Sequence, residues 1–227
     1  MANNGEDPLS PYLSMLNRIR TEESFHERTN RALEQHPYLH AAKDGTLTMA
    51  QRRAFCCEQL AIQHSDACSF AKLAGHDNFD CPSSLAKAVL PEVEEDKKDD
   101  LFHFLLGGEL YASKLLLQHA ASLGLPAEED IVKSYQVTAE GQGYPSYWSR
   151  LALNQQHGAA AAACAVNFPA WGNMCRELLQ ALKEGDYGYD ATTKDDGLAF
   201  IEFFATPIEN LDEMAAKIMH REKVQYE

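Results

Sequence analysis

A run of nine small residues, Gly158 to Val166, constrains the fold of this chain more than any other segment. Alanine favours the helix, but a helix whose side chains are mostly methyl groups buries little apolar area. Such a helix either lies in close contact with neighbouring backbones or forms the thin wall of a cavity. Pro169 follows beside Trp171, and its missing amide hydrogen is expected to kink or interrupt the helix there.

Length and charge limit the classes of protein that this chain can belong to. Its 227 residues suffice for one domain, 1–227, and no linker rich in Pro, Gly or Ser divides them. The net charge of -14 argues against a nucleic-acid partner, because phosphate binding needs clustered Lys and Arg. No apolar run reaches the roughly 20 residues that span a bilayer, and the polar N-terminus does not resemble a signal peptide. We therefore expect a cytoplasmic protein without a membrane partner.

The pattern of apolar residues is helical along nearly the whole chain, and no alternating strand pattern occurs, so the expected class is all-α. Thr48 is the expected N-cap of one long helix, and Pro207 is expected to interrupt the last one. The expected helices are Pro11–Glu34, Gln51–Ala74, Leu85–Leu90, Leu101–Leu123, one starting at Pro126, Tyr147–Val166, Trp171–Lys183 and Leu198–His220.

The cysteines are expected to be buried and reduced. They form no CxxC pair and mostly lie in apolar helical pattern, where free cysteine behaves as a small hydrophobe. A metal or disulfide role is therefore not expected. The six are Cys56, Cys57, Cys68, Cys81, Cys164 and Cys175.

Several short motifs occur in a fixed order along the chain. They are His36-Pro37-Tyr38-Leu39, Asp44 to Thr48, Phe55, Glu109, Gly124-Leu125, the helix at Tyr147, Pro169 with Trp171, and Phe203-Phe204. In order and spacing they resemble the TENA/THI-4 and PQQ-synthase-like proteins of the heme-oxygenase-like fold. The resemblance covers roughly Phe25 to Met214 and implies a multi-helical bundle with a central cavity, a small-molecule ligand and a homo-oligomer.

Thiaminase II-like members of this group place a nucleophilic cysteine directly after the proline that corresponds to Pro169, where this chain has Ala170. Cys175 lies five residues further along, about 500° around a helix, and cannot simply replace it. The resemblance therefore implies a protein that binds a small, flat or apolar metabolite and could act on it as a metal-independent enzyme. A non-catalytic binding or regulatory relative is the alternative.

The Phe-Phe-x-x-x-Ile-Glu spacing of Phe203 to Glu209 resembles a second branch of this fold, the heme-oxygenase-like diiron oxidases. Their ligand positions fall here on side chains unsuited to iron, namely Asn167, Pro207, Leu211 and Met214. Asp96 and His103 could imitate one acid and histidine pair, or could serve a structural or solvent-facing role. We therefore expect no metal and no cofactor, and a metal-dependent oxidase remains a second alternative.

Two acids are candidates for acid-base catalysis because apolar residues flank each of them. Burial of Glu109 would raise its pKa toward a useful value, although it could instead face solvent beside Gly107 and Gly108. Glu202, between Ile201 and Phe203, is expected to be buried.

The expected ligand-binding residues include aromatic rings that could stack on a flat heterocycle or simply form core, and Asn167, which could orient the ligand. The full set is Phe55, Gln59, Ile62, Asp66, Tyr144, Tyr147, Asn167, Trp171, Cys175 and Phe203.

Overall fold

A computed structural model describes residues 7–79, 84–92, 100–189 and 197–225. All regular elements in these ranges are helical, which confirms the all-α class. None of the described helices is both long enough and apolar enough to cross a membrane. The elements are α1 (Ser10–Thr21), α2 (Glu23–Phe25), η1 (His26–Asn30), α3 (Arg31–Glu34), α4 (Pro37–Lys43), α5 (Met49–Leu73), η2 (Leu85–Lys87), α6 (Leu101–Ser122), α7 (Glu128–Ser134), α8 (Gly143–Leu153), α9 (His157–Glu184), α10 (Ala199–Ala205) and α11 (Leu211–Arg221).

Local signals fix the starts of the two central helices. The Gln51 amide donates to the Thr48 hydroxyl over 3.2 Å, and the Thr48 amide donates to Gln51 Oε1 over 2.9 Å. This reciprocal capping box begins α5 and confirms Thr48 as its N-cap. Asp100 caps α6 by accepting a hydrogen bond from the Phe102 amide over 2.9 Å.

Three expected helices have different bounds in the structure. The single helix expected over Tyr147–Val166 is wrong, because Gln155 has a φ of 53° and a left-handed residue cannot continue a right-handed helix. The helix expected over Pro11–Glu34 is broken at Glu22, whose backbone is extended. Of Leu85–Leu90 only the short turn η2 is helical. The interruption expected at Pro207 is confirmed by the gap between α10 and α11.

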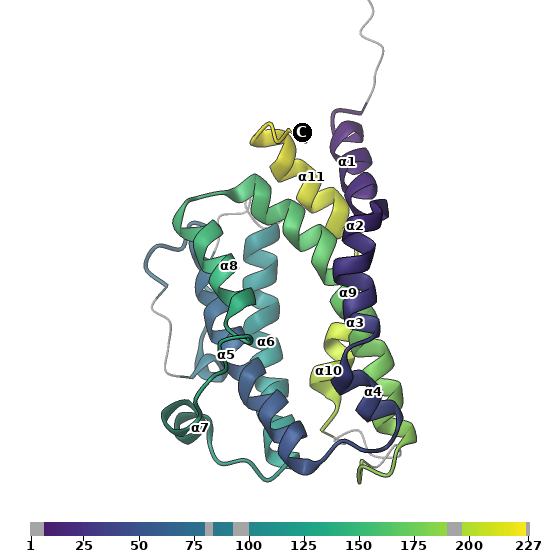
Figure 1. Cartoon of the computed structure of the whole chain (residues 1–227). Coiled ribbons are helices and arrows are strands. Elements are labelled where there is room, and N and C mark those ends of the chain that lie inside the picture. The colour runs from purple at the N-terminus through teal and green to yellow at the C-terminus, as the bar shows by residue number, and fades with distance from the viewer. Residues whose placement is uncertain (1–6, 80–83, 93–99, 190–196, 226–227) are drawn as a thin grey trace, which may run out of the picture.

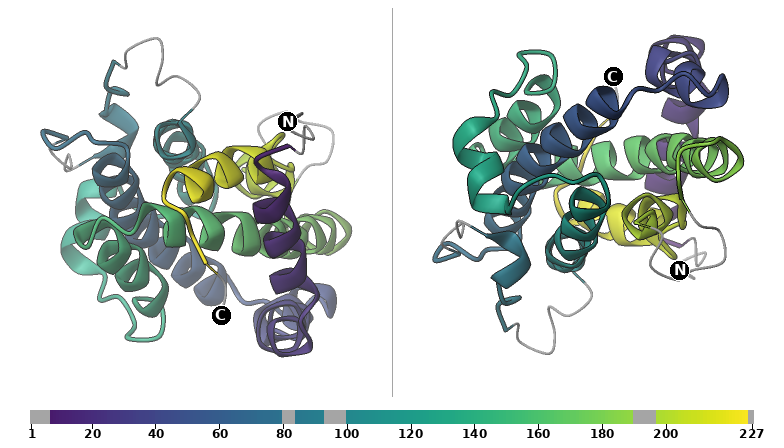
Figure 2. Two further views of the ribbon diagram at one scale, coloured as in Figure 1. Left: turned by 90° about the horizontal axis from the view of Figure 1, so that it is seen from above. Right: turned by 90° about the horizontal axis from the view of Figure 1, so that it is seen from below.

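The helices form two groups that α9 joins. Helix α5 packs against α6 and α8, whereas α9 packs against α4, α10 and α11 and also contacts α8. Figure 1 shows α5, α6 and α8 on one side and the N-terminal helices along the opposite edge. Figure 2 shows α9 running across the molecule between these two groups.

Helix α9 continues through Pro169, so the interruption, one of the two outcomes expected there, is wrong. Proline has no amide hydrogen, so it leaves the carbonyl of Ala165, four residues earlier, without its helical donor. The guanidinium of Arg20 in α1 donates to that carbonyl. Asp212 in α11 holds the guanidinium in place, with 2.7 Å between Arg20 Nη1 and Asp212 Oδ2. Two other helices therefore compensate for the proline.

The small-residue run of α9 packs closely against its neighbours. A methyl group at Gly158 would lie 2.3 Å from Val224 Cγ2, so only glycine leaves room for the C-terminal segment. Ala160, Ala161 and Ala165 have no exposed surface. Close packing, one of the two expectations for this run, is therefore confirmed along these residues.

The cysteines follow the expectation with one exception. Cys56, Cys57, Cys164 and Cys175 are free and buried. Cys68 is disulfide-bonded, which corrects the expectation of a fully reduced set. Cys81 lies outside the described residues.

Candidate functional site

The buried apolar side chains form two clusters, which lie at opposite ends of the antiparallel helices α5 and α6. Phe70 of α5 and Leu106 of α6 belong to the first cluster, and Leu60 and Leu116 of the same helices belong to the second. Buried polar side chains occupy the stretch of each helix between these positions. We call this set, together with Tyr144 of α8, the polar layer: Gln63, Asp66, Glu109, Ser113 and Tyr144.

Helical spacing brings the members of the polar layer together. Gln63 and Asp66 are three residues apart on α5, and Glu109 and Ser113 are four apart on α6, so each pair shares one helix face. The Ser113 hydroxyl lies 2.9 Å from the Glu109 carbonyl oxygen and 3.3 Å from Gln63 Oε1, and it can donate to either. The two faces therefore meet inside the bundle.

Two carboxyl groups dominate the electrostatics of the layer. Burial raises the pKa of Glu109 to about 8, and the nearby Gln63 amide opposes part of that rise. Burial also raises the pKa of Asp66 well above its usual range, and the charge of Glu109 adds to this shift. Two acids this close in a dry interior do not both ionise readily, so the pair retains a proton at neutral pH.

Tyr144 and Cys164 border the two acids. Tyr144 is 39% exposed as a whole, yet burial of its hydroxyl end and the charge of Asp66 raise its pKa. Cys164 of α9 is fully buried, and burial, followed by the charge of Asp66, raises the pKa of its thiol. The phenol and the thiol are therefore neutral, and both can take part in hydrogen bonds.

One polar atom of the layer, Asp66 Oδ1, is shielded from solvent and lacks a hydrogen-bond partner. The Gln63 amide acts on Glu109 and the Trp148 ring nitrogen on Tyr144, although neither contact has the geometry of a normal hydrogen bond. The Trp148 ring contacts Tyr144 edge to face, with 5.9 Å between ring centroids. Native proteins pair nearly all buried polar groups. The unpaired oxygen of Asp66 and these two poorly paired donors indicate a place where a polar ligand would find partners.

Of the two candidate catalytic acids, the structure buries only one. Glu109 is buried as expected, which removes the alternative that it faces solvent. Glu202 is exposed, and its carboxylate lies 3.9 Å from Lys183 Nζ, so the expected burial is wrong. Helix α10 has seven residues and buries Phe200 and Ile201, which turns Glu202 outward.

Of the expected ligand-binding residues, the structure brings Asp66 and Tyr144 to Glu109. The aromatic core reading holds for Phe55, Trp171 and Phe203, which pack on the second apolar cluster, and Cys175 lies within that cluster. The other four are less buried than the two acids: Gln59, Ile62 and Asn167 are half-buried, and Tyr147 is exposed.

Sequence patterns did not identify Gln63, Ser113 and Cys164 as neighbours of the acids. A usable signal was present for two of them, because Gln63 and Ser113 stand one helical turn from Asp66 and Glu109 on the same faces. Cys164 carries no such local signal, because its position beside the acids depends on how α9 packs.

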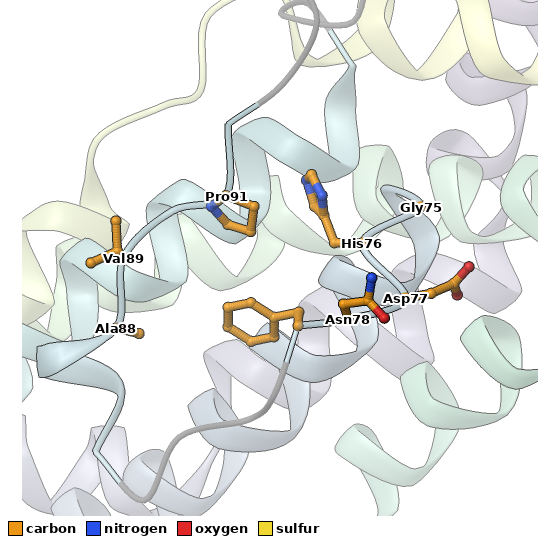
Figure 3. Close-up of a pocket in the computed structure, with 8 residues that line it drawn as sticks. Gly75, His76, Asp77, Asn78, Ala88, Val89 and Pro91 are labelled. Carbon is orange, nitrogen blue, oxygen red and sulfur yellow. The ribbon is translucent and has the colours of Figure 1, made fainter.

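Two pockets among the described residues lie away from the polar layer, and the expected central cavity stays a prediction. One, of about 610 Å³, lies between the turn at Gly75–Phe79 and residues 88–91 (Figure 3). The other, of about 40 Å³, lies between Leu39 and Met174.

Asp96, the expected partner of His103, lies outside the described residues. Within the described ranges, no three His, Cys, Asp or Glu side chains group as metal ligands.

Comparison with known proteins identifies a family. The model of the TENA/THI-4/PQQC family matches residues 23–226, nearly the whole chain. No curated protein and no solved structure gives a significant match. The match agrees with the resemblance that the short motifs carried.

Proposed function

The chain belongs to the TENA/THI-4/PQQC family, and on that premise we propose that it binds a small, flat metabolite at the polar layer and acts on it by acid-base chemistry. Glu109 is the proposed proton donor and acceptor, with Asp66 as its coupled partner. The observation that carries this proposal is the buried pair of acids, in which Asp66 Oδ1 has no hydrogen-bond partner.

The electrostatics of the pair suit proton transfer near neutral pH. A general acid or base is most effective when its pKa lies near the working pH, and the pKa of Glu109 is about 8. Asp66 is deeply buried beside it, so protonation of either acid depends on the other. We do not propose a thiol nucleophile. Ala170 follows Pro169, and the raised thiol pKa values of Cys164 and Cys175 leave little reactive thiolate.

The surrounding groups favour a particular ligand chemistry. Asp66 Oδ1 accepts hydrogen bonds, whereas Gln63 Nε2 and Trp148 Nε1 donate them. The Tyr144 ring, which is 39% exposed and contacts the buried Trp148 ring edge to face, provides flat apolar surface beside these groups. A planar ring that carries both N–H or O–H donors and acceptors satisfies this set.

Binding without catalysis is the second candidate function. Two observations favour it: the second acid expected at the site, Glu202, is exposed, and burial raises the pKa of the free thiols Cys56, Cys164 and Cys175. Turnover of a bound ligand distinguishes the two candidates.

A panel of ring compounds in matched pairs tests binding. One member of each pair carries an amino or hydroxyl donor, and the other carries a methyl group at that position. We expect donor-bearing members to raise the unfolding temperature of the wild-type chain and of Glu213→Gln, a control at an exposed pair with Lys217. Asp66→Asn and Glu109→Gln should lose most of that rise. An equal rise in all four proteins would place binding elsewhere.

Catalysis is then tested with the compounds that bind. Each is incubated with the wild-type chain, and products are measured by mass spectrometry. Conversion that Glu109→Gln abolishes supports the enzyme. Binding without conversion supports the second candidate.

A further inference from the structure

Two histidines from different helices meet at the end of the bundle, remote from the polar layer. His76 lies in the turn that follows α5, and His103 lies in the first turn of α6. His76 Nε2 and His103 Nδ1 are 3.0 Å apart, and their ring centroids are 5.3 Å apart. Because α5 and α6 pack side by side, the fold itself holds the two histidines close together.

The spacing of the two nitrogens is close to that of neighbouring ligands on one metal ion. With metal–nitrogen bonds of about 2.0–2.1 Å, two nitrogens are about 2.9 Å apart at a right angle and about 3.4 Å apart at a tetrahedral angle. The observed 3.0 Å lies near the first value. Right-angled sites of nitrogen and oxygen ligands are typical of Cu²⁺ and Ni²⁺, and Zn²⁺ would need a small separation of the rings.

The surroundings leave room for the remaining ligands. His76 is half-buried and lines the pocket of about 610 Å³, where Figure 3 shows its ring beside Pro91 and the Asp77 side chain pointing away. His103 is 9% exposed, so packing against the core limits the freedom of its ring. The Asp77 carboxylate is held by Lys72 Nζ at 2.5 Å, which leaves water as the further ligand on the pocket side.

The two rings have few other polar partners. Burial, and then the neighbouring His76, lower the pKa of His103, and the Asp100 carboxylate at the start of α6 opposes part of that shift. Neither the His76 nor the His103 side chain forms an ion pair or a second hydrogen bond with a described residue. The half-buried His76 ring can turn more freely than that of His103, and the only polar interaction that metal binding replaces is the hydrogen bond between the two rings.

We propose that His76 and His103 form a binding site for one divalent transition-metal ion, with Cu²⁺ and Ni²⁺ preferred to Zn²⁺. Water on the side of the pocket completes the coordination. The site is separate from the polar layer and does not depend on the function proposed for it.

The full chain without an affinity tag, treated with chelator and dialysed, is titrated with Cu²⁺, Ni²⁺ or Zn²⁺ alone at pH 7.5. We expect one equivalent to bind, and at a hundredfold excess over the dissociation constant the unfolding temperature should rise by roughly 5–10 °C. His76→Ala should weaken binding at least tenfold, since one of two ligands is lost. Electron paramagnetic resonance of the Cu²⁺ complex should show coupling to two imidazole nitrogens, and to one in His76→Ala.

Two further variants make the result decisive. His103→Gln preserves a polar side chain of similar size and should also weaken binding tenfold, whereas His26→Ala, away from the pair, should leave it unchanged. Because His76 lies in a turn, its variant is expected to fold even where a change at the buried His103 is not tolerated. Binding that is equally tight in His76→Ala, or no binding by the wild-type chain, would overturn the proposal.

Discussion

Arg20 donates a hydrogen bond to the carbonyl of Ala165, the group that Pro169 leaves without a helical donor. The contact joins α1 to the middle of α9, and the ion pair of Arg20 with Asp212 joins both to α11. The proline in α9 therefore provides an acceptor for a contact between helices.

Replacement of Arg20 tests this relationship. Arg20→Met keeps the apolar stem but removes the donor, and we expect a loss of about 1–3 kcal/mol in the free energy of unfolding because a carbonyl is left unpaired. Pro169→Ala supplies an amide hydrogen for the same carbonyl, so the loss should be smaller in that background. Urea unfolding of the four proteins in the double-mutant cycle measures the coupling. Equal losses in both backgrounds would show that only the ion pair with Asp212 matters.

The pH dependence of stability should report the buried acid Glu109. Its pKa is raised from 4.5 to about 8 in the folded chain, so the folded state binds the proton more tightly than the unfolded state. The resulting stability is fully present below about pH 4.5 and is lost as the pH rises through about 8. Glu109→Gln should therefore show a shallower decline in unfolding free energy between pH 5 and 8.5, with a difference on the order of a few kcal/mol over this range. Parallel curves for the two proteins would contradict the raised pKa.

The free thiols should react slowly. Burial raises the pKa of Cys56 to about 12 and also raises those of Cys164 and Cys175, so little thiolate is present at neutral pH. Alkylation with iodoacetamide at pH 7.5, followed by intact mass, should leave these three unmodified in the folded chain and modify them in urea. Rapid modification of Cys164 in the folded chain would point to a thiol reaction after all.

Glu202 should have little effect on either stability or binding. Its side chain is 62% exposed, and its ion pair with Lys183 spans 3.9 Å. Glu202→Gln should change the free energy of unfolding by less than about 0.5 kcal/mol. Its response to donor-bearing ring compounds should equal that of the wild-type chain, and a lost response would return Glu202 to the candidate site.

Local sequence patterns predicted the helices and their capping better than the site. The N-cap at Thr48 was predictable because the residues that form the cap, Thr48 and Gln51, are only three positions apart in the sequence. Glu109 and Glu202 both stand between apolar residues, but only packing decides which face of a helix is covered, and Glu202 faces solvent. The break at Gln155 was also unreadable, since any polar residue can precede a helix and the left-handed φ depends on how α8 and α9 pack.

The central claim is that the pair of Asp66 and Glu109 retains a proton inside the bundle at neutral pH. Carbon NMR of the chain with ¹³C-labelled glutamate carboxyls, titrated from pH 4 to 9, tests it most directly, with Glu109→Gln identifying the resonance. We predict one glutamate carboxyl with a pKa near 8, absent from the variant. If every glutamate titrates below about pH 5.5, the pair is ionised at neutral pH and the proposed acid-base site is wrong.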